Sequence, residues 1–168
     1  MKLFVDGNGL IDGFRRLSDP IVKPRDEMDR RLNIARWLAR YAELCDCDVI
    51  CVFDGNPVGR ILPPTERHGR VRVVNLEPDV EALPHLAGPA NRAAKDEETF
   101  VVSDDYRFKS ILAHGKAKLA PVADFLAQAK TRMRGEDKQA YDEPDEKFSG
   151  LARHEVDAWV NFFKNKKR

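Results

Sequence analysis

The sequence lacks any long apolar run and carries almost no net charge. No segment approaches the roughly 20 consecutive apolar residues that a transmembrane helix requires, and Met1-Lys2 leads directly into a core-like strand instead of a signal-type apolar stretch. We therefore expect a cytoplasmic protein with no membrane partner. Lys and Arg number 29 and Asp and Glu number 28, which leaves a net charge of +1. A nucleic-acid partner would consequently have to be bound by a local patch of charge.

Cysteine is scarce as well, and its pattern does not favour a metal site. Cys45, Cys47 and Cys51 form a C-x-C-x3-C pattern, an odd number of thiols with no histidine beside them to complete a zinc site. Reduced cysteines are readily buried in protein cores. We interpret these three as structural thiols, with metal binding as the alternative.

What the sequence does contain is an alternation of short apolar runs with helical patterns. The apolar runs lie at 2–6, 48–54, 71–74 and 99–104, with a shorter segment at 117–120. The helical patterns lie at 25–44, 105–115 and 121–131. Strands that alternate with helices, each strand a continuous apolar run, are typical of a parallel sheet covered on both faces. We therefore predict a single α/β domain, for which 168 residues suffice.

The chain is predicted to divide into three segments. Residues 1–134 form the α/β core, 135–150 form an acidic linker, and 151–168 form a carboxyl-terminal helix that docks on the core and ends in a basic tail. The linker is rich in acids and has little to bury. The helix places Trp159 among apolar residues at helical spacing, which predicts a buried face.

Three predicted strands end on a carboxylate. Asp6, Asp54 and Asp104 each close an apolar run, and Asp105 follows directly. Because the carboxyl ends of parallel strands lie along one edge of an open sheet, where ligands bind, these side chains should lie close together. Such carboxylates repel one another unless protons or a cation intervene, and Mg²⁺ or Mn²⁺ held there bridges to phosphate in phosphodiester cleavage. The alternative is that these acids form turns or cap helices.

A glycine-rich turn is predicted after the first strand, but it does not match a dinucleotide site. Gly7, Gly9 and Gly13 have a spacing one residue off the dinucleotide fingerprint. Asp6 would also lie where a pyrophosphate needs bare backbone amides. We therefore predict no nucleotide cradle at this turn.

Five short motifs together resemble a known family. They are FVDGNGLI, VFDGNP, FVVSDDYRF, FLAQ and SGLARHEVDAW, in this order between Lys2 and Phe163. They are similar to the NYN domain, in particular its YacP-like branch within the PIN-like nuclease superfamily. The resemblance implies a Rossmann-like sheet of the PIN type and a metal-dependent nuclease that acts on RNA. The acidic positions of the family would fall on Asp6, Asp54, Asp104 and Asp105, and supporting positions on Asn8 and Ser103.

The chain departs from the family pattern in two places. The first motif of the family usually contains Asp-Gly-Tyr-Asn, whereas Asn8 directly follows Gly7 here. A further acidic motif before the fourth strand has no counterpart in 77–98, where prolines and a glycine are expected to interrupt a helix. The nearest replacements are Asp79 and Glu81. If neither reaches the site, cation affinity falls.

The segment 59–72 follows the second acidic strand end and is basic. It contains Arg60, Arg67, Arg70 and Arg72, which are predicted to attract the phosphate backbone of RNA. The alternative is a solvated, arginine-rich loop. His68 and His114 qualify as acid–base groups by residue type alone.

These observations lead to one predicted function and two alternatives. The prediction is a Mg²⁺- or Mn²⁺-dependent endoribonuclease that cleaves RNA phosphodiester bonds. The first alternative is a non-catalytic RNA- or ribosome-binding module with a degenerate metal site. The second is a DNA-directed nuclease, because no feature of the sequence distinguishes RNA from DNA. The sequence predicts no oligomeric state.

Overall fold

A computed structural model describes residues 1–55 and 62–139. The chain divides into two compact units, Met1–Glu136 and Asp137–Arg168, so the first unit is described apart from 56–61. The predicted helix at 151–168, with Trp159, lies outside the described residues, as does Arg60. Helix α5, Val122–Gln139, includes the first residues of the segment predicted as a linker, and the rest of that segment is not described.

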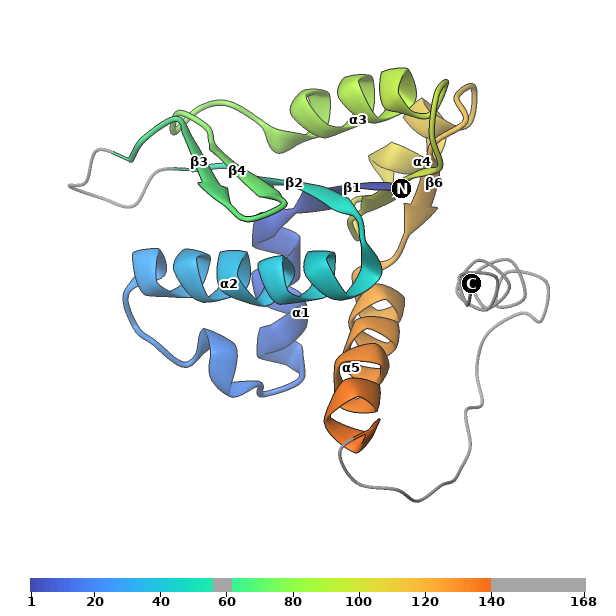
Figure 1. The fold of residues 1–168 in the computed structure, drawn as a ribbon. Helices are drawn as coiled ribbons and strands as arrows, with labels where there is room; N and C mark the ends of the chain where they lie inside the picture. The colour runs from blue at the N-terminus through green and yellow to red at the C-terminus, as the bar shows by residue number, and fades with distance from the viewer. Residues whose placement is uncertain (56–61, 140–168) are drawn as a thin grey trace. The chain divides into compact units, whose positions relative to one another are not determined.

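The described residues form a six-stranded, mostly parallel sheet (Figure 1). The strands are β1 (Lys2–Asp6), β2 (Asp48–Phe53), β3 (Thr65–His68), β4 (Val71–Asn75), β5 (Thr99–Val102) and β6 (Lys118–Ala120). Their order across the sheet is β3-β4-β2-β1-β5-β6. Only β3 is antiparallel to its neighbour. The predicted α/β class is therefore confirmed.

Helices cover both faces of this sheet (Figure 1). They are α1 (Gly7–Arg16), η1 (Pro20–Val22), α2 (Glu27–Cys45), α3 (Ala82–Ala93), α4 (Arg107–Leu112) and α5. On one face, α3 and α4 pack on a core that includes Phe4, Val101 and Phe108. On the other, α1, α2 and α5 meet in an aromatic cluster of Phe14, Trp37, Tyr41 and Phe125. The central strands read as continuous apolar runs because both of their faces are buried.

Helix α1 begins where the sequence predicts a glycine-rich turn, so that prediction is wrong. The glycines serve close approach rather than a loop conformation. A Cβ on Gly7 would lie 2.4 Å from the Phe53 ring, and one on Gly9 would lie 2.8 Å from Oδ2 of Asp6. The helix forms despite the low helix propensity of glycine because Leu10 and Phe14 are fully buried.

Helix α3 also contradicts the sequence, which predicts an interruption at Pro84, Gly88 and Pro89. Pro84 lies in the first turn, where backbone N–H groups have no helical partner in any case. Pro89 lies inside the helix and removes one hydrogen bond. Burial of Leu86 and Ala90 against the sheet compensates for that loss.

Strand β3 is a third element that the sequence does not predict. It pairs with β4 through a hairpin in which Gly69 has a φ of +57°, a backbone conformation that glycine adopts without strain. Its sequence, Thr65–His68, has no apolar residue and hence no strand pattern. No helix within 1–55 and 62–139 is long and apolar enough to cross a membrane.

Candidate functional site

The structure brings the predicted strand-end acids to one edge of the sheet. Asp6 is the last residue of β1 and pairs in register with Val52 of β2, two residues before Asp54. Strand β5 lies on the other side of β1 and is followed by Ser103, Asp104 and Asp105. We call Asp6, Asp54, Asp104 and Asp105 the acidic edge.

Asp6 is half-buried, and both of its carboxylate oxygens accept hydrogen bonds. Its Oδ1 accepts the backbone N–H of Gly9 at 2.8 Å, which caps the amino terminus of α1. Its Oδ2 accepts the hydroxyl of Ser103 at 2.8 Å. Burial raises the pKa of Asp6, and the negative charges of Asp54 and Asp105 raise it further, against the lowering effect of the two hydrogen bonds.

Ser103 connects two acids of the edge. Its side chain is buried, its hydroxyl donates to Asp6, and the same oxygen accepts the backbone N–H of Asp105 at 3.1 Å. The supporting position predicted for Ser103 is thus in contact with the acidic edge.

Asn8 holds the second strand end in place. Its Nδ2 donates to the backbone oxygen of Asp54 at 2.9 Å and also to the carboxylate of Asp54. Asn8 lies in the first turn of α1, so the helix that Asp6 caps also positions Asp54. Although its place in the motif differs from the family pattern, Asn8 reaches the acidic edge.

Arg31 also positions the end of β2, and the sequence analysis did not select it. Its side chain is 5% exposed, and its Nη2 donates to the backbone oxygens of Asp54 at 3.1 Å and Gly55 at 2.6 Å. The guanidinium also lies 4.9 Å from the centroid of the Phe53 ring and pairs with Glu27 at 2.6 Å. The Glu27-x-x-x-Arg31 spacing in the predicted helix was the available signal.

Asp105 contacts the start of the helix that follows it, α4, as the cap interpretation expects, whereas Asp104 contacts the start of α5. Oδ1 of Asp104 accepts the N–H of Val122 at 2.9 Å, at the start of α5, and its other oxygen pairs with Arg16. Oδ1 of Asp105 accepts the N–H of Arg107 at 2.9 Å, at the start of α4. A cap role and a ligand role do not exclude each other, because a carboxylate has about four lone pairs.

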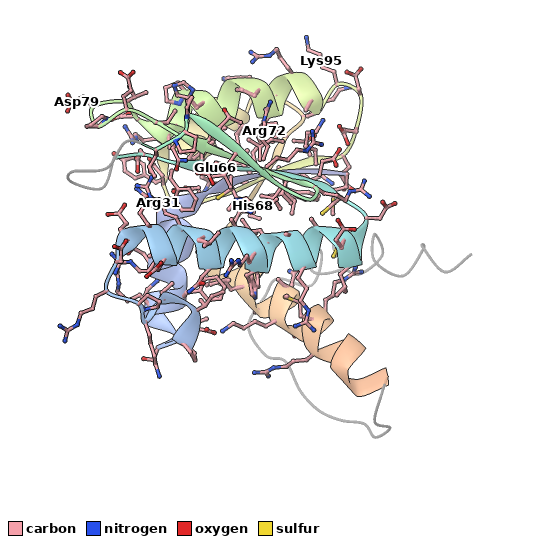
Figure 2. The ribbon with its side chains drawn as sticks, turned by 60° about the vertical axis from the view of Figure 1, so that its left-hand side comes forward. Arg31, Glu66, His68, Arg72, Asp79 and Lys95 are labelled. Carbon is pink, nitrogen blue, oxygen red and sulfur yellow. The ribbon has the colours of Figure 1, made fainter. Side chains whose placement is uncertain are left out.

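Arg107 joins Asp105 to one of the two predicted replacement acids. Its guanidinium binds both oxygens of Asp105, which lowers the pKa of that carboxyl group. The same guanidinium lies 3.1 Å from Oε2 of Glu81. Asp79 is exposed in the turn before α3 (Figure 2). The structure therefore connects Glu81 to the edge through an arginine, and it shows no such link for Asp79.

The acids do not form a ready-made metal cage. Within 1–55 and 62–139, no three His, Cys, Asp or Glu side chains are arranged to hold a metal ion. Two of the four acids of the edge instead pair with Arg16 and Arg107. A hydrated Mg²⁺ or Mn²⁺ needs only one or two carboxylates plus water, and Asp6 lies near the negative charges of Asp54 and Asp105, which a cation there would neutralise.

The described arginines of the basic segment, Arg67, Arg70 and Arg72, are not gathered at this edge. Arg70 pairs with Asp46 and Asp48, at the amino-terminal end of β2 and so at the opposite edge of the sheet. Arg67 of β3 pairs in register with Arg72 of β4. Within the described residues, Arg16 and Arg107 form ion pairs with the carboxylates of the acidic edge.

The three cysteines, all within the described residues, are buried thiols. Burial raises the pKa of Cys47 to about 12 and also raises the pKa of Cys51. Cys47 and Cys51 are therefore protonated at neutral pH, as expected for structural thiols.

The fold and the acidic edge together define a nuclease-like α/β domain of the PIN type. The chain belongs to the YacP-like NYN domain family, whose model matches residues 3–163. No curated protein matches the sequence.

Solved structures of one relative have the same fold. A mutant of Rae1 (YacP) from Bacillus subtilis has a TM-score of 0.61 and 16% sequence identity, over 97% of this chain and 87% of that chain. A second crystal structure of Rae1 (YacP) from Bacillus subtilis has a TM-score of 0.59 and 17% identity, over 98% and 86%. At this identity the likeness shows the fold alone.

Proposed function

We propose that this domain is a divalent-metal-dependent endoribonuclease that cleaves RNA at the acidic edge. The observation that carries the proposal is the state of Asp6. This carboxylate is half-buried, is hydrogen-bonded at both oxygens, and is subject to the negative charges of Asp54 and Asp105. A carboxylate that only caps a helix does not require negative charges beside it, whereas clustered negative charges favour the binding of a cation.

Some residues of such a site would bind the cation, and others would orient those ligands. Asp6, together with Asp54 or Asp105, would hold Mg²⁺ or Mn²⁺, which lowers the pKa of bound water and stabilises negative charge on phosphate. Ser103 fixes the orientation of Asp6, and Asn8 fixes that of Asp54. These contacts pre-organise the carboxylates, so that little reorganisation is needed when a ligand binds.

Two arginines supply positive charge beside the acids. Arg16 and Arg107 have side chains that are 60% and 46% exposed, so each can exchange its carboxylate partner for a phosphate oxygen of RNA. Guanidinium groups suit this exchange because their planar fork matches carboxylate and phosphate alike. The acidic edge would thereby bind a polyanion despite its own negative charge.

A non-catalytic RNA- or ribosome-binding module is the second candidate. It is favoured by the lack of a three-acid metal group in the described part of the chain and by the pairing of Asp104 and Asp105 with arginines. Such a module would bind RNA equally well with and without divalent metal.

Incubation of the purified full chain with end-labelled single-stranded RNA separates the two. The nuclease proposal predicts internal cleavage with Mg²⁺ or Mn²⁺ and intact RNA with EDTA. Binding without cleavage in either metal would support the binding module instead. A labelled DNA strand of the same sequence, which the proposal expects to stay intact, tests the choice of RNA.

A further inference from the structure

We infer that Tyr106 is a stacking position for an unpaired nucleobase, placed beside the acidic edge. The inference rests on the proposed action on RNA and adds the form of RNA that the site accepts, a single strand. Tyr106 is 84% exposed, the highest value among the large hydrophobic residues that the structure shows at the surface; Leu17 is 55% and Ile111 is 41% exposed.

The position of Tyr106 distinguishes it from an ordinary exposed side chain. It lies between Asp105, an acid of the edge, and Arg107, the cation that pairs with that acid. Single exposed hydrophobic residues are common on protein surfaces, and exposure alone would carry no function. Here the exposed ring, the carboxylate and the guanidinium come from three consecutive residues at the end of a central strand.

Hydrogen bonds fix the backbone around Tyr106, so the point from which its side chain projects is defined. The carboxylate of Asp105 accepts the N–H of Arg107 at 2.9 Å, and the carbonyl of Asp105 accepts the N–H of Phe108 at 3.1 Å. The carbonyl of Tyr106 in turn accepts the N–H of Lys109 at 3.1 Å. Phe108 is buried and anchors α4 to the core. The chain thus places one aromatic ring of α4 inside and presents another to solvent.

This pairing of groups matches the chemistry of single-stranded RNA. An aromatic ring stacks on the face of any unpaired base, and a nearby cation binds the phosphate next to it. Bases in a duplex are stacked on each other and are not available to a side chain. The inferred ligand is therefore an unpaired base adjacent to the phosphate that the acidic edge receives.

Binding is tested with fluorescence anisotropy on the full chain, with Ca²⁺ in place of Mg²⁺ so that binding is measured apart from cleavage. The two ligands are a short labelled single-stranded RNA and an abasic ribose-phosphate chain of equal length. Tyr106→Ala should weaken binding of the RNA by about five- to 150-fold, the range for loss of one stacked base. Tyr106→Phe should bind like the wild type because it keeps the ring.

Two controls show whether a change in the affinity for RNA comes from the loss of a stacked base. Ile111→Ala removes an exposed hydrophobic side chain from the same helix and should leave the affinity for RNA unchanged. The abasic chain should bind equally to the wild type and to Tyr106→Ala. Equal affinity of Tyr106→Ala and wild type for the RNA, or equal loss with the abasic chain, would overturn the stacking role while leaving the nuclease proposal intact.

The two proposals fail in different ways. If the wild type binds RNA in a Tyr106-dependent manner but cleaves none with Mg²⁺ or Mn²⁺, the stacking role stands and the nuclease proposal fails. If the wild type binds neither ligand, both the stacking role and action on RNA are overturned. An unchanged melting temperature of Tyr106→Ala, expected for a side chain this exposed, shows that lost binding is not lost folding.

Discussion

The hydroxyl of Ser103 donates to Oδ2 of Asp6 across 2.8 Å, and this contact ties the ends of two neighbouring strands together. Strands β1 and β5 are parallel neighbours, so their last residues lie side by side although they are distant in sequence. The contact holds the carboxylate of Asp6 in one orientation. Burial disfavours the negative charge that Asp6 carries when it is deprotonated.

Replacement of Ser103 tests how much this contact stabilises the fold. Ser103→Ala removes a donor to a buried carboxylate and an acceptor for the N–H of Asp105. We expect it to lower the free energy of unfolding at neutral pH by roughly 1–3 kcal/mol, measured by urea denaturation in EDTA. Ser110→Ala is the matched control, since this exposed hydroxyl bonds only locally, to the carbonyl of Arg107. Equal stability of the two variants would contradict the role assigned to Ser103.

The raised pKa of Asp6 predicts a pH dependence of stability with a definite sign. Because the folded state holds the Asp6 proton more tightly than the unfolded chain, whose value is 3.8, the contribution of Asp6 to stability falls as pH rises through the folded pKa. In Asp6→Asn this side chain does not titrate, so the variant does not lose that stability as pH rises. It still caps α1, since Asn is also a good N-cap. The variant should therefore gain stability relative to the wild type between about pH 4 and pH 7.

Urea denaturation in EDTA at both ends of that range measures this gain. The other carboxylates are common to both proteins, so they cancel in the difference between variant and wild type. A difference that stays constant or shrinks as pH rises would show that Asp6 titrates normally.

Arg31 should matter for stability as much as for the site. Arg31→Met leaves the carbonyl groups of Asp54 and Gly55 without their buried donor, and we expect a loss of about 3 kcal/mol in urea denaturation. Arg31→Lys should recover little, because a single ammonium cannot reach partners on several sides. Arg36→Met, at an exposed position of the same helix, should stay close to the wild type.

Substitutions of Arg107 and Arg70 distinguish between two possible positions of the phosphate-binding surface. If RNA phosphates bind at the acidic edge, Arg107→Gln should reduce the salt dependence of single-stranded RNA binding by about 0.7 log units per decade of salt, the value for one lost contact. Arg70→Gln, which changes a cation at the opposite edge, should leave that slope unaltered. An unaltered slope for Arg107→Gln together with a reduced slope for Arg70→Gln would instead place RNA binding on the segment 59–72, as the sequence suggested.

The parallel strands and their terminal acids were predictable because each signal is local. An apolar run that ends on Asp can be recognised without knowledge of its neighbours, and parallel topology then brings the ends together. That reasoning sufficed for Asp6 and Asp54. The prediction of a helix at 105–115 was confirmed in part, since α4 spans only Arg107–Leu112, with the N–H of Arg107 donating to Asp105.

What the sequence did not reveal depends on tertiary contacts. Nothing near Asp104 indicates that it caps α5 at Val122 or pairs with Arg16, because both partners are remote along the chain. The interior proline of α3 is tolerated only because burial of Leu86 and Ala90 stabilises that helix. Propensity rules describe an isolated segment, and here packing overrides them.

The most direct test of the account is RNA cleavage by Asp6→Asn with Mg²⁺ and Mn²⁺, measured together with the metal-free melting temperature. The account predicts cleavage by the wild type and a loss of more than about tenfold in the variant, with a melting temperature in EDTA equal to or above that of the wild type. Asp12→Asn, which changes an exposed acid of α1, should cleave normally. Undiminished cleavage by Asp6→Asn, or no cleavage by the wild type in either metal, would contradict the account.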